Sequence, residues 1–220
     1  MQEEKNGNKI TELVFILDKS GSMAGKESDT VGGFNAMIAE RQKSGGGALV
    51  TTVLFSNEWT MLHDRKPIGE IEPLTGKDNA PLGGTALLDA IGDAIEHIKK
   101  VHKYARSEDV PTHTIFSITT DGLENASTRF SSDRVKKMIK EQEAEHDWQF
   151  LFAAANIDAV ETAKDIGISA SRAANYKVKM DTRPMYMAMS RMISNLEADE
   201  QKDDYETVLK ELKEKRKKKR

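Results

Sequence analysis

Cysteine is absent from this sequence of 220 residues. Its absence excludes disulfide bonds, zinc sites built from thiolates and a cysteine nucleophile, and it is consistent with a reducing compartment. The sequence also has no apolar run near the roughly 20 residues that a helix needs to span a bilayer. Its first residues, MQEEKNGNK, are polar and acidic, whereas a secretory signal would be basic and then apolar. We therefore expect a soluble, cytoplasmic protein without a membrane span.

Basic charge is scarce over most of the chain. The formal net charge is −3, but the last eight residues, KEKRKKKR, contribute +6, which leaves −9 for the first 212 residues. In a nucleic-acid-binding domain the basic surface belongs to the fold itself. An acidic body with a basic terminal segment is unlike such a domain. We therefore expect no nucleic-acid partner, and we interpret the basic tail as a solvated segment, with contact to nucleic acid or an anionic membrane as the alternative.

Short apolar, β-branched segments alternate with helical patterns along the chain. Strands are expected at 11–17, 48–56, 58–64, 112–120, 148–156 and 174–180. Helices are expected at about 28–43, along an apolar stripe from Leu88 to Val101, at 131–146, at 158–167 and from about Pro184 onward. The short polar turn between the second and third strands predicts a hairpin, and therefore an antiparallel edge strand.

This alternation predicts the fold class. With 38% hydrophobic residues, the chain can bury one sizeable core. Strands that alternate with helices form a mainly parallel sheet that is covered on both faces. We expect an α/β, Rossmann-like, doubly wound fold with a six-stranded sheet, one antiparallel edge strand and helices on both faces. In such sheets, ligands bind in the crevice at the carboxyl ends of the strands.

We expect three parts along the chain: a polar segment at 1–9, a domain at 10–197, and a charged helical extension with a basic tail at 198–220. Late in the domain, four side chains fall on one helix face and are expected to pack against the sheet: Met185, Met189, Met192 and Leu196. In the extension, a narrow apolar stripe can dock on the body of this chain or on another chain: Tyr205, Val208, Leu209 and Leu212.

Oxygen-bearing side chains follow two of the predicted strands. The stretch FILDKSGSM places Asp18, Ser20 and Ser22 directly after an apolar strand, and Asp121 in TTDG follows another. Thr85 ends PLGGT, where the clearest helical pattern begins. Their common position relative to strand ends makes these residues candidates to converge on one ion. Oxygen donors without histidine or cysteine favour a hard cation, Mg²⁺ first, with Mn²⁺ or Ca²⁺ as alternatives.

Each of these segments also has a simpler interpretation. Asp, Ser and Gly after a strand are ordinary turn residues, and Thr85 is a suitable helix N-cap. Glu124 and Asn125 either form a turn or orient the site. The alternative function is a Mg²⁺-dependent phosphotransferase or phosphatase that uses Asp18. Phosphatases of the haloacid-dehalogenase type carry D-x-D, but this chain has Ser20 at the second position, and a hydroxyl is no general acid near neutral pH.

Taken together, the three segments resemble the metal-ion-dependent adhesion site (MIDAS) of the von Willebrand factor type A (VWA) domain. The pattern of that family is D-x-S-x-S, then a later Thr and a later Asp. This chain supplies DKSGS, the Thr of GGTALLDA and the Asp of TTDG. The similarity spans about residues 10–195. It implies direct or near-direct metal ligands at Ser20, Ser22 and Thr85, and ligands bound directly or through water at Asp18 and Asp121.

The resemblance also implies a fold and a function. It implies the VWA fold, in which a Glu or Asp of a partner protein completes the coordination of the metal and the final helix can shift in response. We therefore expect a metal-dependent protein-binding module and not an enzyme. The sequence predicts neither the identity of the partner nor the oligomeric state.

Overall fold

A six-stranded sheet forms the centre of the molecule. The computed structural model describes residues 10–25, 27–45, 47–155, 157–176, 182–199 and 203–217, with residues 216 and 217 described without their side chains. The strand order is β3-β2-β1-β4-β5-β6. The strands are β1 Thr11–Asp18, β2 Ala48–Phe55, β3 Trp59–Pro67, β4 His113–Thr120, β5 Gln149–Ala154 and β6 Ala173–Asn175. β3 runs antiparallel to β2, and the other neighbouring pairs are parallel. The predicted sheet and its antiparallel edge are confirmed.

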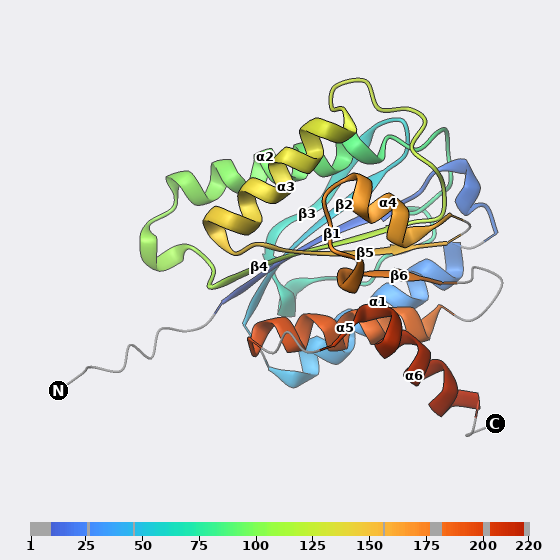
Figure 1. The fold of residues 1–220 in the computed structure, drawn as a ribbon. Helices are drawn as coiled ribbons and strands as arrows, with labels where there is room; N and C mark the ends of the chain where they lie inside the picture. The colour runs from blue at the N-terminus through green and yellow to red at the C-terminus, as the bar shows by residue number, and fades with distance from the viewer. Residues whose placement is uncertain are drawn as a thin grey trace.

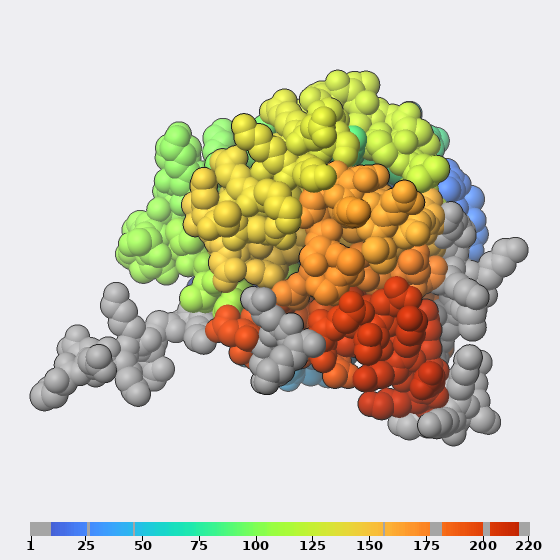
Figure 2. Space-filling model, viewed as in Figure 1, coloured from blue at the N-terminus to red at the C-terminus, as the bar shows by residue number. Residues whose placement is uncertain are grey.

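Helices cover both faces of this sheet (Figure 1). One face carries α2 Leu87–Tyr104, α3 Ser132–His146 and α4 Ala159–Asp165. The other face carries α1 Glu27–Ser44, α5 Arg183–Glu197 and α6 Tyr205–Lys217. Short 3-10 turns lie in the connections: η1 Gly21–Met23, η2 Ile68–Glu70, η3 Ser107–Asp109 and η4 Ala170–Arg172. Figure 2 shows the first layer in yellow and orange above the red helices of the second. The doubly wound fold class is confirmed.

The central strand β1 explains the longest apolar run of the first half of the sequence. All eight of its residues are buried, and successive side chains point to opposite faces of the sheet. Phe15 and Leu17 join the core beneath α1 and α5, whereas Val14 and Ile16 join the core beneath α2. A strand that is covered on both faces needs apolar residues at nearly every position. The chain becomes polar at Asp18, where the strand leaves the sheet.

Two strands end at positions that differ from the prediction. β3 continues past 64, because Lys66 and Pro67 still pair with Val50 and Leu49 of β2. β6 is a three-residue strand that pairs with the end of β5. Positions 177–180 of the strand predicted there lie outside the described residues.

The helix α5 packs closely on α1. Its four predicted core residues are at most 4% exposed, which confirms their packing: Met185, Met189, Met192 and Leu196. A Cβ added to Gly33 of α1 would lie 2.1 Å from the ring of Tyr186 on α5. The close approach of the two helices therefore requires glycine at this position.

The last helix, α6, docks on its own chain. Tyr205, Val208 and Leu209 are at most 1% exposed and belong to the same core as α5, and Leu212 packs partly against it. Of the two interpretations of this apolar stripe, the structure selects docking on the body of the chain. The domain boundary near 197 stays a prediction. Within the described ranges, no helix has both the length and the apolar character needed to cross a membrane.

Candidate metal centre

The five predicted ligands lie at the end of the sheet where the parallel strands have their carboxyl ends. Asp18 is the last residue of β1, and Asp121 directly follows β4, which runs beside β1 in the same direction. Ser20 caps the 3-10 turn η1, and Ser22 lies within it. Thr85 precedes α2 by two residues. Three segments that are distant in sequence therefore approach one another here.

The Asp18 carboxylate is held inside the fold. It is 1% exposed, and its Oδ1 accepts a hydrogen bond from the backbone N–H of Ser20 at 2.7 Å. Its Oδ2 accepts one from the hydroxyl of Thr120 at 2.6 Å. Burial raises the pKa of the Asp18 carboxyl above its usual value, although these hydrogen bonds oppose the rise. The charged form of Asp18 is thus costly to bury and would be stabilised by a nearby cation.

A chain of hydroxyl groups connects the first segment to the third. The Oγ atoms of Ser20 and Ser22 lie 2.8 Å apart. The hydroxyl of Ser22 donates to Oδ1 of Asp121 at 2.5 Å. Ser20 and Asp121 are buried, whereas Ser22 is exposed. The cluster therefore opens to solvent at Ser22.

Gly122 brings Thr85 into the same cluster. A Cβ added to Gly122 would lie 3.1 Å from Oγ1 of Thr85 and 3.2 Å from Oγ of Ser22. Asn125 fixes the backbone of Thr85 from both sides: its Oδ1 accepts from the Thr85 N–H at 2.9 Å, and its own N–H donates to the Thr85 carbonyl at 3.1 Å. The structure thus brings all five predicted oxygen donors together.

Backbone hydrogen bonds join the loops that carry these donors. The N–H of Gly21 donates to the carbonyl of Gly83 at 3.0 Å, and the N–H of Leu82 donates to the carbonyl of Lys19 at 2.9 Å. The N–H of Lys19 in turn donates to the carbonyl of Phe55, at the end of β2. Because these contacts are made by the main chain, the relative position of the loops does not depend on the functional side chains.

No protein-family model and no curated protein matches this sequence. Solved structures do match its fold. The vWF domain of the type V pili tip protein Mfa5 from Porphyromonas gingivalis aligns with a TM-score of 0.62 and 10% identity, over 85% of this chain and 96% of that one. A von Willebrand factor type A structure from Catenulispora acidiphila aligns with a TM-score of 0.57 and 13% identity, over 83% of this chain and 42% of that one. The chain has the VWA fold.

A third solved structure also matches this fold. Proximal thread matrix protein 1 from the mussel byssus, with a zinc-occupied MIDAS motif, aligns with a TM-score of 0.56 and 12% identity. The alignment covers 84% of this chain and 46% of the mussel protein. This chain therefore spans less than half the length of the mussel and Catenulispora chains. At these identities the similarity establishes the VWA fold alone.

Two residues that the sequence analysis left undecided hold the segment of Thr85 in place. Asn125 positions Thr85, as described above. The carboxylate of Glu124 accepts hydrogen bonds from the N–H of Leu88 in the first turn of α2, from the N–H groups of Ala126 and Ser127, and from the Ser127 hydroxyl. Glu124 thus caps α2 from a neighbouring loop, and neither residue is merely a turn former.

Thr120 and Asp89 were not among the predicted residues. The Thr120 hydroxyl reaches Asp18 only because β4 lies beside β1. In the sequence, only its position directly before Asp121 could have indicated such a role. Asp89 of α2 accepts hydrogen bonds at 2.9–3.0 Å from three backbone N–H groups, those of Thr128, Arg129 and Phe130. Burial opposes ionisation of Asp89, but these hydrogen bonds hold its pKa below the usual value. Asp89 therefore ties the loop after Asp121 to α2.

The cluster suits a hard divalent cation. It offers two carboxylates and three hydroxyls, with no nitrogen or sulfur donor. Among the described residues, no group of three or more His, Cys, Asp or Glu is placed to hold a metal, so a cation here would also depend on the hydroxyl oxygens. A carboxylate has about four lone-pair positions, so Asp18 and Asp121 keep acceptor capacity beyond the hydrogen bonds given above. The buried charge of Asp18 and the close approach of the Thr85 and Ser22 hydroxyls to Gly122 both favour a cation.

Proposed function

We propose that this VWA domain binds a partner protein through a divalent cation held by Asp18, Ser20, Ser22, Thr85 and Asp121. The observation that carries the proposal is the convergence of these five oxygen donors from three segments of the chain. The zinc in the MIDAS of the mussel protein supports a divalent ion in a site of this kind. We propose Mg²⁺ as the ion, with Mn²⁺ or Ca²⁺ as alternatives, because all three prefer oxygen ligands.

The donor set determines what the bound ion would contribute. Two carboxylates neutralise a divalent charge, and hydroxyls are weak neutral ligands, so the ion would keep an affinity for one more anionic oxygen. A Glu or Asp side chain of the partner would supply that oxygen. Ser22 is the exposed member of the cluster, so the partner would approach from its side.

Two apolar side chains beside the site extend the proposed contact surface. Leu82 is 74% exposed, and its backbone is hydrogen-bonded to the loop of Lys19. Leu123 is 65% exposed and follows Asp121 by two residues. Buried apolar anchors beside a polar contact contribute much of the affinity of protein interfaces. We propose that the acidic residue of the partner is flanked by apolar residues.

The proposed role is binding and not catalysis. A phosphotransferase nucleophile needs an oxygen that can attack the substrate, but both oxygens of Asp18 accept hydrogen bonds inside the fold and the residue is 1% exposed. Ser20, which occupies the position of the general acid in D-x-D phosphatases, is also buried. Release of phosphate from a chromogenic phosphate ester in Mg²⁺, lost on Asp18→Asn, would instead support the enzyme alternative.

A two-stage binding experiment tests the proposal. Wild-type protein and the variants Asp121→Asn and Asp109→Asn are immobilised and exposed to native lysate with Mg²⁺ or with chelator. Asp109 is the matched control, because it is an exposed acid in η3, which precedes the other end of β4. The expected partner is recovered with Mg²⁺ by the wild type and by Asp109→Asn, and is lost with chelator or with Asp121→Asn.

In the second stage, the exposed acidic residues of the recovered protein are replaced one at a time by their amides. One such replacement should abolish recovery, because an amide oxygen carries no charge to offer the cation. A partner that binds equally well in chelator, or that tolerates every replacement, contradicts the proposal.

A further inference from the structure

A cavity lies at the opposite end of the sheet from the metal centre. Its volume is about 420 Å³, and it is lined by Lys99, His102, Lys103, Val110, Pro111, Thr114, Gln142, His146 and Trp148. Thr114 lies near the start of β4 and Asp121 follows its end, so the two sites are separated by about 23 Å of extended chain. A volume of this size is within the usual range for pockets that bind small organic ligands, roughly 300–1,000 Å³. The cavity is therefore a separate site and not an extension of the cation cluster.

Gln142 lines this cavity and carries a polar atom without a partner among the described residues. The residue is 1% exposed, and its Oε1 is buried without a hydrogen-bond partner in the part of the chain that the structure describes. A buried acceptor without a partner destabilises the folded protein, because its hydration is lost and nothing replaces it. If the amide turns toward the cavity on binding, a ligand that presents an N–H or O–H group to Oε1 would remove that cost.

The rim of the cavity is basic. Lys103 is exposed and forms no ion pair with a described residue, although its ammonium lies 5.6 Å from the ring of Tyr104. Lys99 pairs with Glu141 at 2.8 Å, and His102 is hydrogen-bonded to buried Glu12 at 2.9 Å. Glu141 and Glu12 are thus already engaged. The available charge, at Lys103, favours an anionic ligand.

Trp148 forms a fixed apolar wall. It is 3% exposed, stacks on Phe116 at a centroid distance of 5.4 Å and meets the ring of His102 edge-on at 5.5 Å. Val110 and Pro111, in the connection between α2 and β4, line the cavity as well. This connection stands out in green at the left of Figure 2, beside the yellow surface of α3. An apolar body with a charged end would match these surroundings.

We propose that this cavity binds a small organic anion. Its carboxylate or phosphate would lie at Lys103, its apolar body against Val110, Pro111 and Trp148, and an N–H or O–H group would donate to Oε1 of Gln142. The site would act independently of the divalent cation, because none of its lining residues belongs to the metal centre.

The first test uses probes that differ in these features. Indole-3-acetate has an anionic end, an apolar ring and an N–H; 1-methylindole-3-acetate lacks only the N–H; adenosine monophosphate offers a phosphate in place of the carboxylate. Calorimetric titration of the full chain in chelator should detect at least one of the first and third probes. Binding of one but not the other shows which of the two kinds of anion the cavity accepts. Failure of both to bind at millimolar concentration overturns the proposal.

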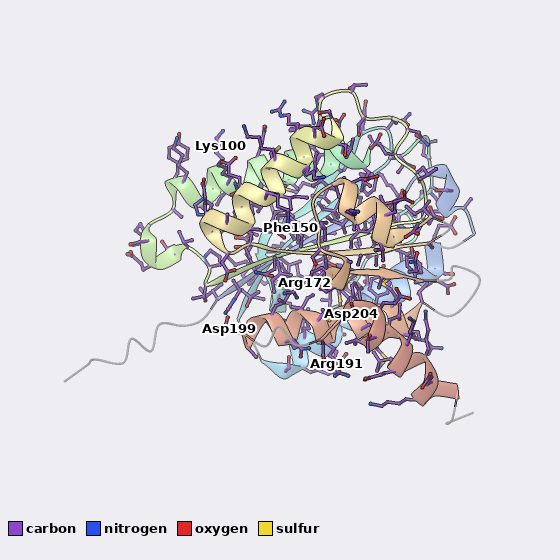
Figure 3. All side chains as sticks on the ribbon, viewed as in Figure 1. Lys100, Phe150, Arg172, Arg191, Asp199 and Asp204 are labelled. Atoms are coloured by element: carbon purple, nitrogen blue, oxygen red, sulfur yellow. The ribbon has the colours of Figure 1, made fainter. Side chains whose placement is uncertain are left out.

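The second test assigns the contacts with three variants. Lys103→Gln should lower the affinity for indole-3-acetate about fivefold, whereas Lys100→Gln should leave this affinity unchanged. Lys100, labelled in Figure 3, lies on the same helix but does not line the cavity. Gln142→Met should lower the affinity for indole-3-acetate about tenfold and leave the affinity for 1-methylindole-3-acetate unchanged. The assignment would be overturned if the two lysine variants lost the same affinity for indole-3-acetate. It would also be overturned if Gln142→Met lowered the affinity for both indole probes equally.

Discussion

At the carboxyl end of the sheet, Asp18 accepts hydrogen bonds from Ser20 and Thr120, and the Ser22 hydroxyl donates to Asp121. At the amino end, the buried Oε1 of Gln142 has no partner among the described residues. The carboxyl end thus carries two acidic side chains whose oxygens accept hydrogen bonds. The amino end carries an acceptor without a hydrogen-bond partner, beneath a rim of basic side chains. The ligands that we propose for the two ends are therefore of opposite charge. Substitutions at the two ends should therefore differ in their effects on the response to Mg²⁺ and on the free energy of unfolding.

Asp18→Asn should have the largest effect. The wild type should gain about 2.7 kcal/mol of unfolding free energy at a Mg²⁺ concentration about a hundred times its Kd, and the variant should gain none. In chelator the variant should be at least as stable as the wild type, because an amide can accept from Ser20 and donate to Thr120 without burying a charge. Thermal unfolding with and without Mg²⁺ checks both statements. A variant that keeps the Mg²⁺ response would show that Asp18 is no part of the site.

Asp89→Asn should destabilise the protein by about 2 kcal/mol at neutral pH, because an amide nitrogen cannot accept the hydrogen bonds that the second carboxylate oxygen receives. The pKa of Asp89 is lowered by folding from 3.8. Its contribution is therefore fully present above about pH 5 and is lost as the pH falls through the folded-state pKa.

Urea unfolding at several pH values checks this expectation. The difference between the wild type and Asp89→Asn should shrink in acid, whereas Asp109→Asn, at an exposed position, should stay close to the wild type at every pH. A difference that is constant down to the acid limit would contradict a role for the Asp89 carboxylate.

Gly122→Ala should lower the affinity for Mg²⁺ about tenfold, a change of about 1.4 kcal/mol. The added Cβ would crowd the hydroxyls of Thr85 and Ser22, which must be free to turn toward the ion. Gly32→Ala is the matched control, since a Cβ there meets no atom within 4 Å, and alanine in a helix is slightly stabilising. Calorimetric titration compares the two. Equal affinities for Mg²⁺ would place the ion away from Gly122.

Gln142→Met should have the smallest effect and the opposite sign to Asp89→Asn. Replacing the unsatisfied amide by an apolar side chain of similar size should stabilise the ligand-free protein by about 1 kcal/mol. Urea unfolding in chelator measures this difference. Destabilisation by the same amount would mean that Gln142 is satisfied in the free protein.

The comparison also explains which parts of the molecule could be predicted from the sequence. Asp18, Ser20 and Ser22 are adjacent in the chain and follow an apolar strand, so their common position could be inferred before the fold was known. Thr85 and Asp121 could be added because each lies at a strand end or a helix start. The strands themselves were predictable, because a buried parallel strand such as β1 is apolar on both faces.

Contacts that depend on the order of the strands could not be predicted. Thr120 reaches Asp18 only because β4 lies beside β1. Glu12, directly before the apolar run LVFIL, is fully buried because Arg65 and His102 reach it from β3 and α2. Gln142 lies in the polar stretch EQEAEH, which indicates a solvated helix face. Its burial follows from the packing of α3, so no local pattern revealed the cavity.

Paramagnetic relaxation by Mn²⁺ tests the central claim most directly, because it locates the ion without requiring a partner. In ¹⁵N-labelled protein, substoichiometric Mn²⁺ should broaden the amide resonances of Ser20, Ser22, Thr85 and Gly122 first, and excess Mg²⁺ should restore them. The resonances of Lys103 and Gln142, at the other end of the sheet, should stay sharp. Broadening that begins elsewhere, or that Mg²⁺ does not reverse, would contradict a divalent-cation site at the carboxyl ends of β1 and β4.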